Sequence, residues 1–145
     1  MTETTHKPDQ VIPIPTNKEK FFLEYLMIKK PIFNYILKRL NNGQEIPTKA
    51  PVLHDMQMRV LAQLLYYNNE YKELSDPQRS KAVFDYEIKQ KIMEKLEISE
   101  DNLNAYFSQL RKIRILDGKK INPHFVVYPE SSSFEVIFQF KIDEK

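Results

Sequence analysis

Cysteine is absent from this sequence of 145 residues. No disulfide framework can therefore hold the chain together, and no site can use thiolate groups for metal binding or redox chemistry. Glycine is scarce as well, with two residues in the whole chain, and no glycine-rich loop of the kind that cradles phosphate groups occurs. This composition fits a reducing cell interior.

Long apolar runs are also missing. The later apolar stretches are amphipathic and much shorter than the roughly 20 residues that cross a bilayer. The first one, at residues 11–14, is interrupted by proline and does not look like a signal peptide. We therefore expect no membrane span and a cytoplasmic protein.

The chain has no strong excess of either charge. It contains 22 basic and 20 acidic residues, and its formal net charge is +2. A domain that binds nucleic acid mainly through phosphate contacts is usually more basic than this. The hydrophobic content of 41% is ordinary for a globular protein. The length predicts one domain with a short appendage.

The beginning of the chain predicts an extended arm. Residues 1–17 are polar at first and then contain two closely spaced prolines, which prevent a regular helix. Two interpretations are open for this arm. Either it is a disordered leader, or three apolar side chains dock on a partner subunit, namely Val11, Ile12 and Ile14.

Helical spacing of apolar residues follows the arm. Residues 18–43 are expected to form a helical extension, which Pro31 breaks or kinks into two segments. The loop of residues 44–52 leads to residues 53–67, whose continuous apolar stripe predicts the strongest helix and the spine of the core. The main domain is therefore expected to span residues 53–145.

Two capping signals divide the middle of the chain. Ser75 or Asp76 is expected to begin one helix, with Pro77 in its first turn. Residues 79–96 predict either one helix or a broken pair. A tight turn then precedes Ser99, which is expected to cap the next helix, with two acidic residues in its first turn.

After this helix the apolar period changes from helical to two. Residues 119–128 and 134–142 are therefore predicted as the strands of a hairpin, joined by a turn at residues 129–133. Every second residue from Phe134 to Ile142 is apolar, which predicts one buried face for this hairpin.

A helix, a tight turn, a second helix with outward polar side chains and a hairpin are the parts of a winged helix-turn-helix. The matching stretches are "KIMEKLEISEDNLNAYFSQLRKIRIL" and "GKKINPHFVV". From about residue 53 to residue 142 the chain resembles the winged-helix proteins of phages and plasmids, among them MarR-like regulators and plasmid replication initiators. This resemblance implies a mainly α fold with a C-terminal β-hairpin, a winged helix-turn-helix with an N-terminal helical extension.

The resemblance also implies duplex DNA as a partner, in transcription regulation or replication initiation. Asparagine and glutamine can pair with adenine in the major groove, and basic side chains hold phosphates. The residues expected to enter the groove are Asn102, Asn104, Ala105, Ser108 and Gln109. The residues expected to hold phosphates are Arg111, Lys112, Arg114, Lys119 and Lys120. If the helical extension exchanges between subunits, as in MarR-type dimers, it would also form a homo-oligomer interface.

Two features of the same stretch weigh against DNA. Glu100 and Asp101 lie at the end of the helix that would meet phosphate, and the predicted hairpin turn contains Glu130 but no basic residue. A second interpretation therefore stays open, in which the protein is a phage virion structural or assembly component. The winged helix and the arm would then contact neighbouring subunits, and the protein would reside in the virion and not in the host cytoplasm.

No constellation in the sequence predicts catalysis. His6, His54 and His124 are far apart, and no pair has metal-ligand spacing. Carboxylate pairs such as Glu94 and Glu97 are expected on solvated helix faces, and no serine nucleophile motif occurs. We therefore expect no enzymatic activity, no cofactor and no metal.

Overall fold

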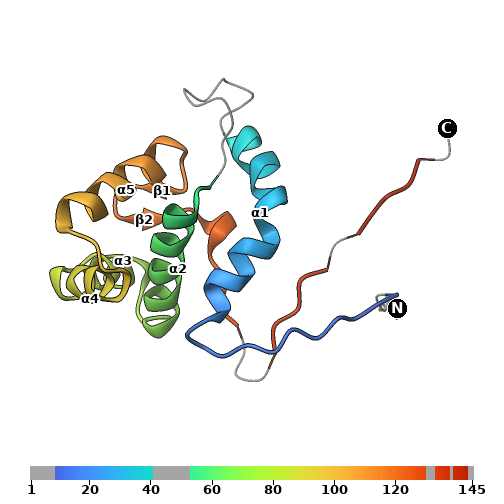
Figure 1. Cartoon of the computed structure of the whole chain (residues 1–145), viewed down its shortest axis with the longest axis horizontal. Coiled ribbons are helices and arrows are strands. Elements are labelled where there is room, and N and C mark those ends of the chain that lie inside the picture. The colour runs from blue at the N-terminus through green and yellow to red at the C-terminus, as the bar shows by residue number, and fades with distance from the viewer. Residues whose placement is uncertain (1–8, 41–52, 130–132, 138, 144–145) are drawn as a thin grey trace.

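The structure is a computed structural model of the chain, and it describes residues 9–40, 53–129, 133–137 and 139–143, with the backbone alone at residues 31 and 33–40. Within these residues the fold is mainly helical and includes a small antiparallel hairpin, as predicted (Figure 1). The elements are α1 (Phe21–Leu40), α2 (Asp55–Glu70), α3 (Asp76–Val83), α4 (Tyr86–Leu96), α5 (Glu100–Lys112), β1 (Leu116–Asp117), β2 (Lys120–Ile121) and the 3₁₀ helix η1 (Pro123–Phe125). None of these helices is long and apolar enough to cross a membrane in the part of the chain that is described.

Helix α2 is the centre of the core, as its apolar stripe predicts. Val60, Leu61, Leu64 and Leu65 are fully buried, and α2 contacts α1, α3, α4 and α5 (Figure 1). Apolar residues at this spacing lie on one broad side of a helix, so the four surrounding helices can all pack against α2.

Helix α1 continues through Pro31, so the break that was expected there as one alternative is wrong, and one helix spans Phe21–Leu40. A proline inside a helix lacks the N–H that would bond the carbonyl four residues earlier, which here belongs to Met27. The Met27 side chain is exposed, so water can reach this part of the helix and replace the missing donor. Phe22 and Leu26 are buried in the common core, and their burial offsets the remaining cost of the proline.

Helices α3 and α4 are the broken pair that the sequence left open. Ser75 is the N-cap of α3, and its hydroxyl accepts the N–H of Gln78 at 3.4 Å, with proline in the first turn as predicted. Phe84 ends α3, and Asp85 is the N-cap of α4. The buried residues of this region include Val83, Phe84, Ile88 and Ile92.

The hairpin is shorter than predicted and uses a different partner strand. β1 pairs with β2 in the register Leu116↔Ile121 and Asp117↔Lys120, so residues 134–142 are not its second strand. Gly118 has a φ of +61°, a conformation that favours glycine, in the two-residue loop. The strand ends early because Asn122 turns the chain into η1, where its side chain accepts the N–H of His124 at 3.0 Å.

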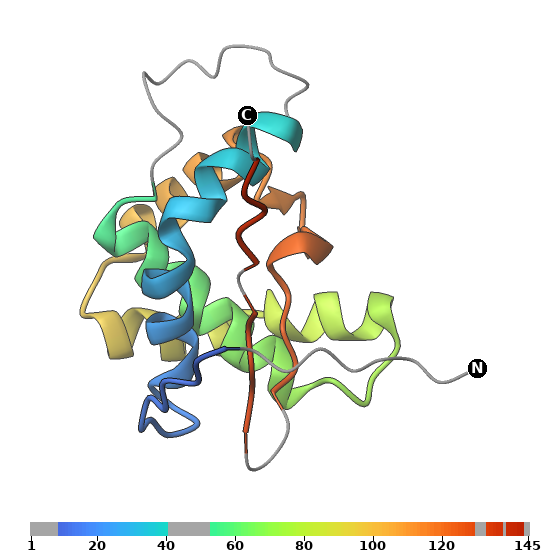
Figure 2. The same cartoon turned by 90° about the vertical axis from the view of Figure 1, so that its right-hand side faces the viewer.

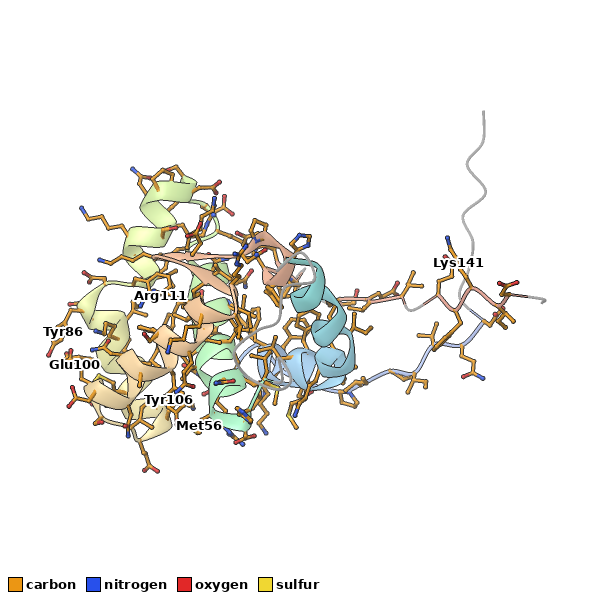
Figure 3. The ribbon with its side chains drawn as sticks, turned by 90° about the horizontal axis from the view of Figure 1, so that it is seen from above. Met56, Tyr86, Glu100, Tyr106, Arg111 and Lys141 are labelled. Atoms are coloured by element: carbon orange, nitrogen blue, oxygen red, sulfur yellow. The ribbon has the colours of Figure 1, made fainter. Side chains whose placement is uncertain are left out.

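The buried face that was predicted for residues 134–142 is also wrong. Phe134 is half-buried, but the side chains of Phe140 and Ile142 are each 87% exposed. We call residues 133–143 the C-terminal segment and residues 9–17 the N-terminal arm. The arm and the segment both leave the helical body on the same side (Figures 1 and 3). In Figure 2, which is viewed from that side, they lie in front of the body. A strand pattern buries a face only if another strand or layer is close enough to cover it.

Candidate nucleic-acid interface

A three-residue turn joins α4 to α5 and sets the direction of α5. Glu97 ends α4 in the left-handed conformation, with a φ of 55°. The N–H of Ile98 then bonds the carbonyl of Met93 at 3.1 Å, which satisfies one of the last acceptors of the helix. Ser99 caps α5, and its hydroxyl accepts the N–H of Asn102 at 3.2 Å, as predicted.

Helix α5 has one apolar face and one polar face. Leu103, Phe107 and Leu110 are buried, and α5 packs on α2 and α4 through this side. All five residues predicted to enter a groove are exposed, namely Asn102, Asn104, Ala105, Ser108 and Gln109. The structure therefore brings the predicted residues together on the outward side of one helix.

Two of these polar side chains are held by neighbours that the sequence did not indicate. The Gln109 amide oxygen accepts a hydrogen bond from Nε2 of the buried Gln57 on α2, at 2.6 Å. The Asn104 amide oxygen accepts one from Nζ of Lys89 on α4, at 2.9 Å. Such bonds restrict the rotamers of these exposed amides and turn their oxygens toward α2 and α4.

Lys89 also changes the electrostatics at the start of α5. Its ammonium nitrogen lies 3.7 Å from a carboxylate oxygen of Glu100, and its side chain is largely buried. One of the two acids that weighed against phosphate is therefore partly neutralised by a lysine of the preceding helix. Asp101 is exposed beside it.

The hairpin is attached to the C-terminal end of α5. Nε of Arg111 donates to the carbonyl oxygen of Gly118 at 3.0 Å, and its guanidinium carbon lies 5.9 Å from the ring centre of Phe107. The Asn122 side chain donates to the carbonyl of Arg114 at 3.2 Å. These contacts hold the hairpin loop next to the last turn of the helix.

The hairpin tip carries basic charge, contrary to the prediction from the sequence. The predicted tip at residues 129–133 is wrong, and Glu130 lies outside the described residues. The tip is the loop from Asp117 to Lys120, and both of its lysines are exposed. Together with the end of α5 it presents five exposed basic side chains, Arg111, Lys112, Arg114, Lys119 and Lys120.

We call α5 and this hairpin, with their exposed polar and basic side chains, the α5–hairpin face. Figure 3 places Glu100 and Arg111 of this face far from Lys141, which lies in the C-terminal segment. The face and the two extended ends are therefore separate surfaces of the molecule.

Ionic contacts elsewhere join the start of the chain to the helical body. Lys95 on α4 donates to the carboxylate of Glu19, and this hydrogen bond lowers the pKa of Glu19 and raises the pKa of Lys95. A hydrogen bond with Glu70 raises the pKa of the Tyr66 hydroxyl on α2. The first contact joins the residues just before α1 to α4, whereas Tyr66 and Glu70 lie one turn apart on α2.

The two histidines that the structure describes lie in different elements. His54 is the N-cap of α2 and His124 lies in η1, while His6 is outside the described residues. In the described part of the chain, no three histidine or carboxylate side chains come close enough to hold an ion.

Comparison with protein-family models, with curated proteins and with solved structures found no match to this chain.

Proposed function

We propose that the α5–hairpin face binds duplex DNA, with the outward side of α5 in the major groove and the basic residues on phosphates. The observation that carries this proposal is the bond from Arg111 to the carbonyl of Gly118, which keeps the basic hairpin loop beside the last turn of α5. Five basic residues and one acid lie between residues 111 and 120. They form a local positive field in a chain whose overall charge is close to neutral.

Contacts to bases would come from the amide side chains of α5. An amide group can donate and accept at the same time, so Asn102 suits the paired donor and acceptor edge of adenine, while Gln109, whose oxygen accepts from Gln57, can donate from its NH₂ group. Lys89 reduces the repulsion that Glu100 would exert on phosphate, because the two side chains are paired. A winged helix-turn-helix regulator or replication initiator uses its second helix and wing in this way, and this is the role that we propose.

The salt dependence of binding tests the phosphate contacts. Duplex DNA of random sequence is titrated with the protein at low salt, and fluorescence anisotropy measures the dissociation constant as salt is raised. Lys112→Ala, Lys119→Ala and Lys120→Ala should each weaken binding and lower the slope of log K against log salt by about 0.9 for each phosphate that is no longer neutralised. Asn102→Ala should leave that slope unchanged, because an amide that contacts a base edge neutralises no phosphate.

A matched control is Lys72→Ala, which removes an exposed lysine from the loop after α2. It should leave the affinity within experimental error of the parent. Absence of binding to any duplex at low salt would overturn the proposal, and so would an equal loss of affinity in Lys72→Ala and Lys112→Ala.

The exposed apolar ends support a second candidate function. Val11 and Ile12 are 68% and 76% exposed in the N-terminal arm, and Ile14 is exposed beside them. Exposed apolar residues in an extended arm suit docking on a neighbouring subunit. We therefore propose, as the alternative, a structural or assembly component of a phage particle. A chain that binds no DNA but joins a particle through residues 9–17 would favour this alternative.

A further inference from the structure

The C-terminal segment has the sequence of a β-strand but no strand partner among the described residues. Its first aromatic residue is anchored, because the Phe134 ring lies 5.1 Å from the ring of Phe21 and 5.7 Å from that of Tyr25. Beyond this anchor, residues 135–137 and 139–143 belong to no helix or strand, and Ile137, Phe140 and Ile142 are exposed. In the part of the chain that the structure describes, this segment pairs with no other strand, so its backbone N–H and C=O groups and its apolar side chains can meet a further strand.

The pattern of this segment is complementary to itself. If two copies of residues 134–142 pair in antiparallel orientation about their midpoint, Phe134 lies opposite Ile142 and Val136 lies opposite Phe140. In the same register Glu135 lies opposite Lys141, and this pair occurs twice because of the two-fold symmetry. Opposite residues share a face of the ribbon. One face is therefore apolar, and the other face is closed by two pairs of opposite charge.

The anchor on α1 strengthens this arrangement. A two-stranded ribbon alone is marginally stable in water. Because Phe134 contacts Phe21 and Tyr25, the register brings Ile142 of the second copy beside these aromatic rings. The end of each strand would then pack on the helical body of the other copy.

We propose that residues 134–142 of two copies of this chain pair as an antiparallel β-ribbon and form a symmetric dimer. The chain's own N-terminal arm is a poorer partner, since Pro13 and Pro15 cannot donate to a ladder. The ribbon lies away from the α5–hairpin face (Figure 3), so this inference goes beyond the proposed function and does not depend on it.

The test is the mass of the full chain in solution, measured by sedimentation equilibrium over a range of concentrations. The parent should form a dimer of twice 17.3 kDa. Glu135→Lys or Lys141→Glu places like charges opposite each other at two sites, so each should raise the dimer dissociation constant about tenfold. The double variant Glu135→Lys with Lys141→Glu restores the opposite pairs and should return the constant to near the parent value.

The controls separate this register from general association. Lys72→Glu changes the net charge as much as Lys141→Glu does and should leave the dimer intact. All positions changed are exposed, and the helical circular dichroism signal of each variant confirms that the body is folded. A monomer at every concentration overturns the proposal, and so does a double variant as weak as the single ones.

Cysteine pairing provides a second measurement, because the parent has no cysteine. Ile137 lies opposite Gln139 in the proposed register. Under mild oxidation, a mixture of Ile137→Cys and Gln139→Cys chains should form a disulfide-linked dimer faster than either variant alone. Equal rates in the mixture and in the separate variants would contradict the register. DNA binding is measured apart from these experiments, so the failure of one proposal is distinguishable from the failure of the other.

Discussion

The helical body and the two extended ends differ in where their apolar side chains find partners. In the body, the stripes of α2, α4 and α5 are buried against one another, and residues such as Leu64 and Ile92 are inaccessible to solvent. In the C-terminal segment, an equally regular pattern leaves Phe140 and Ile142 exposed. A pattern of period 3.6 or of period two therefore indicates which side chains share a face, and not whether the same chain covers that face.

The largest difference is expected between a buried and an exposed aliphatic residue. Leu64→Ala removes a side chain at the centre of α2 and should lower the free energy of unfolding by about 2–5 kcal/mol. Ile12→Ala in the N-terminal arm should change it by about 0.5 kcal/mol or less. Urea denaturation followed by circular dichroism measures both. Similar losses of stability in the two variants would mean that the arm is packed on the body.

A smaller difference is expected between two serines. The hydroxyl of Ser99 caps α5, so Ser99→Ala should cost about 1 kcal/mol of unfolding free energy. Ser133→Ala, which makes the same chemical change at an exposed position of the C-terminal segment, should cost about 0.5 kcal/mol or less. The same denaturation experiment compares them. If Ser99→Ala were neutral, the turn between α4 and α5 would not depend on its cap.

The smallest effect concerns the ion pair between Glu19 and Lys95. Because Lys95 lowers the pKa of Glu19 below its ordinary value of 4.5, the pair stabilises the fold above that pH. This contribution disappears as the pH falls through the lowered pKa. Lys95→Ala should therefore raise the pKa of Glu19 toward 4.5, as measured by carboxyl NMR titration. Lys91→Ala, one turn earlier on α4, should not move it, and an unchanged pKa in Lys95→Ala would refute the pairing.

The helices of the body could be predicted because their signals are local. Ser75 and Ser99 cap helices whose first turns they adjoin, and Leu103, Phe107 and Leu110 face inward at helical spacing. The exposed positions of α5 follow from the same spacing. The polar face of the candidate site was therefore predictable residue by residue.

The hairpin could not be predicted in the same way, because residues 116–117 and residues 134–142 could each pair with the strand that contains Lys120 and Ile121. Residues 134–142 have the better strand pattern, yet Leu116 and Asp117 pair with β2 across a two-residue loop. A short loop brings its ends together at little entropic cost, whereas the longer connection must first be ordered. This choice placed the basic loop, and not residues 129–133, at the tip.

The sequence by itself determined the positions of α2 and α5, the caps Ser75 and Ser99 and the two faces of α5, since these depend on residues no more than about four positions apart. Only the tertiary structure decided which polar groups meet. It joined Gln57 to Gln109 and Lys89 to Glu100, and it placed the loop at Gly118 beside Arg111. These contacts depend on how the helices pack, and the packing brings together side chains whose separation along the chain carries no local signal.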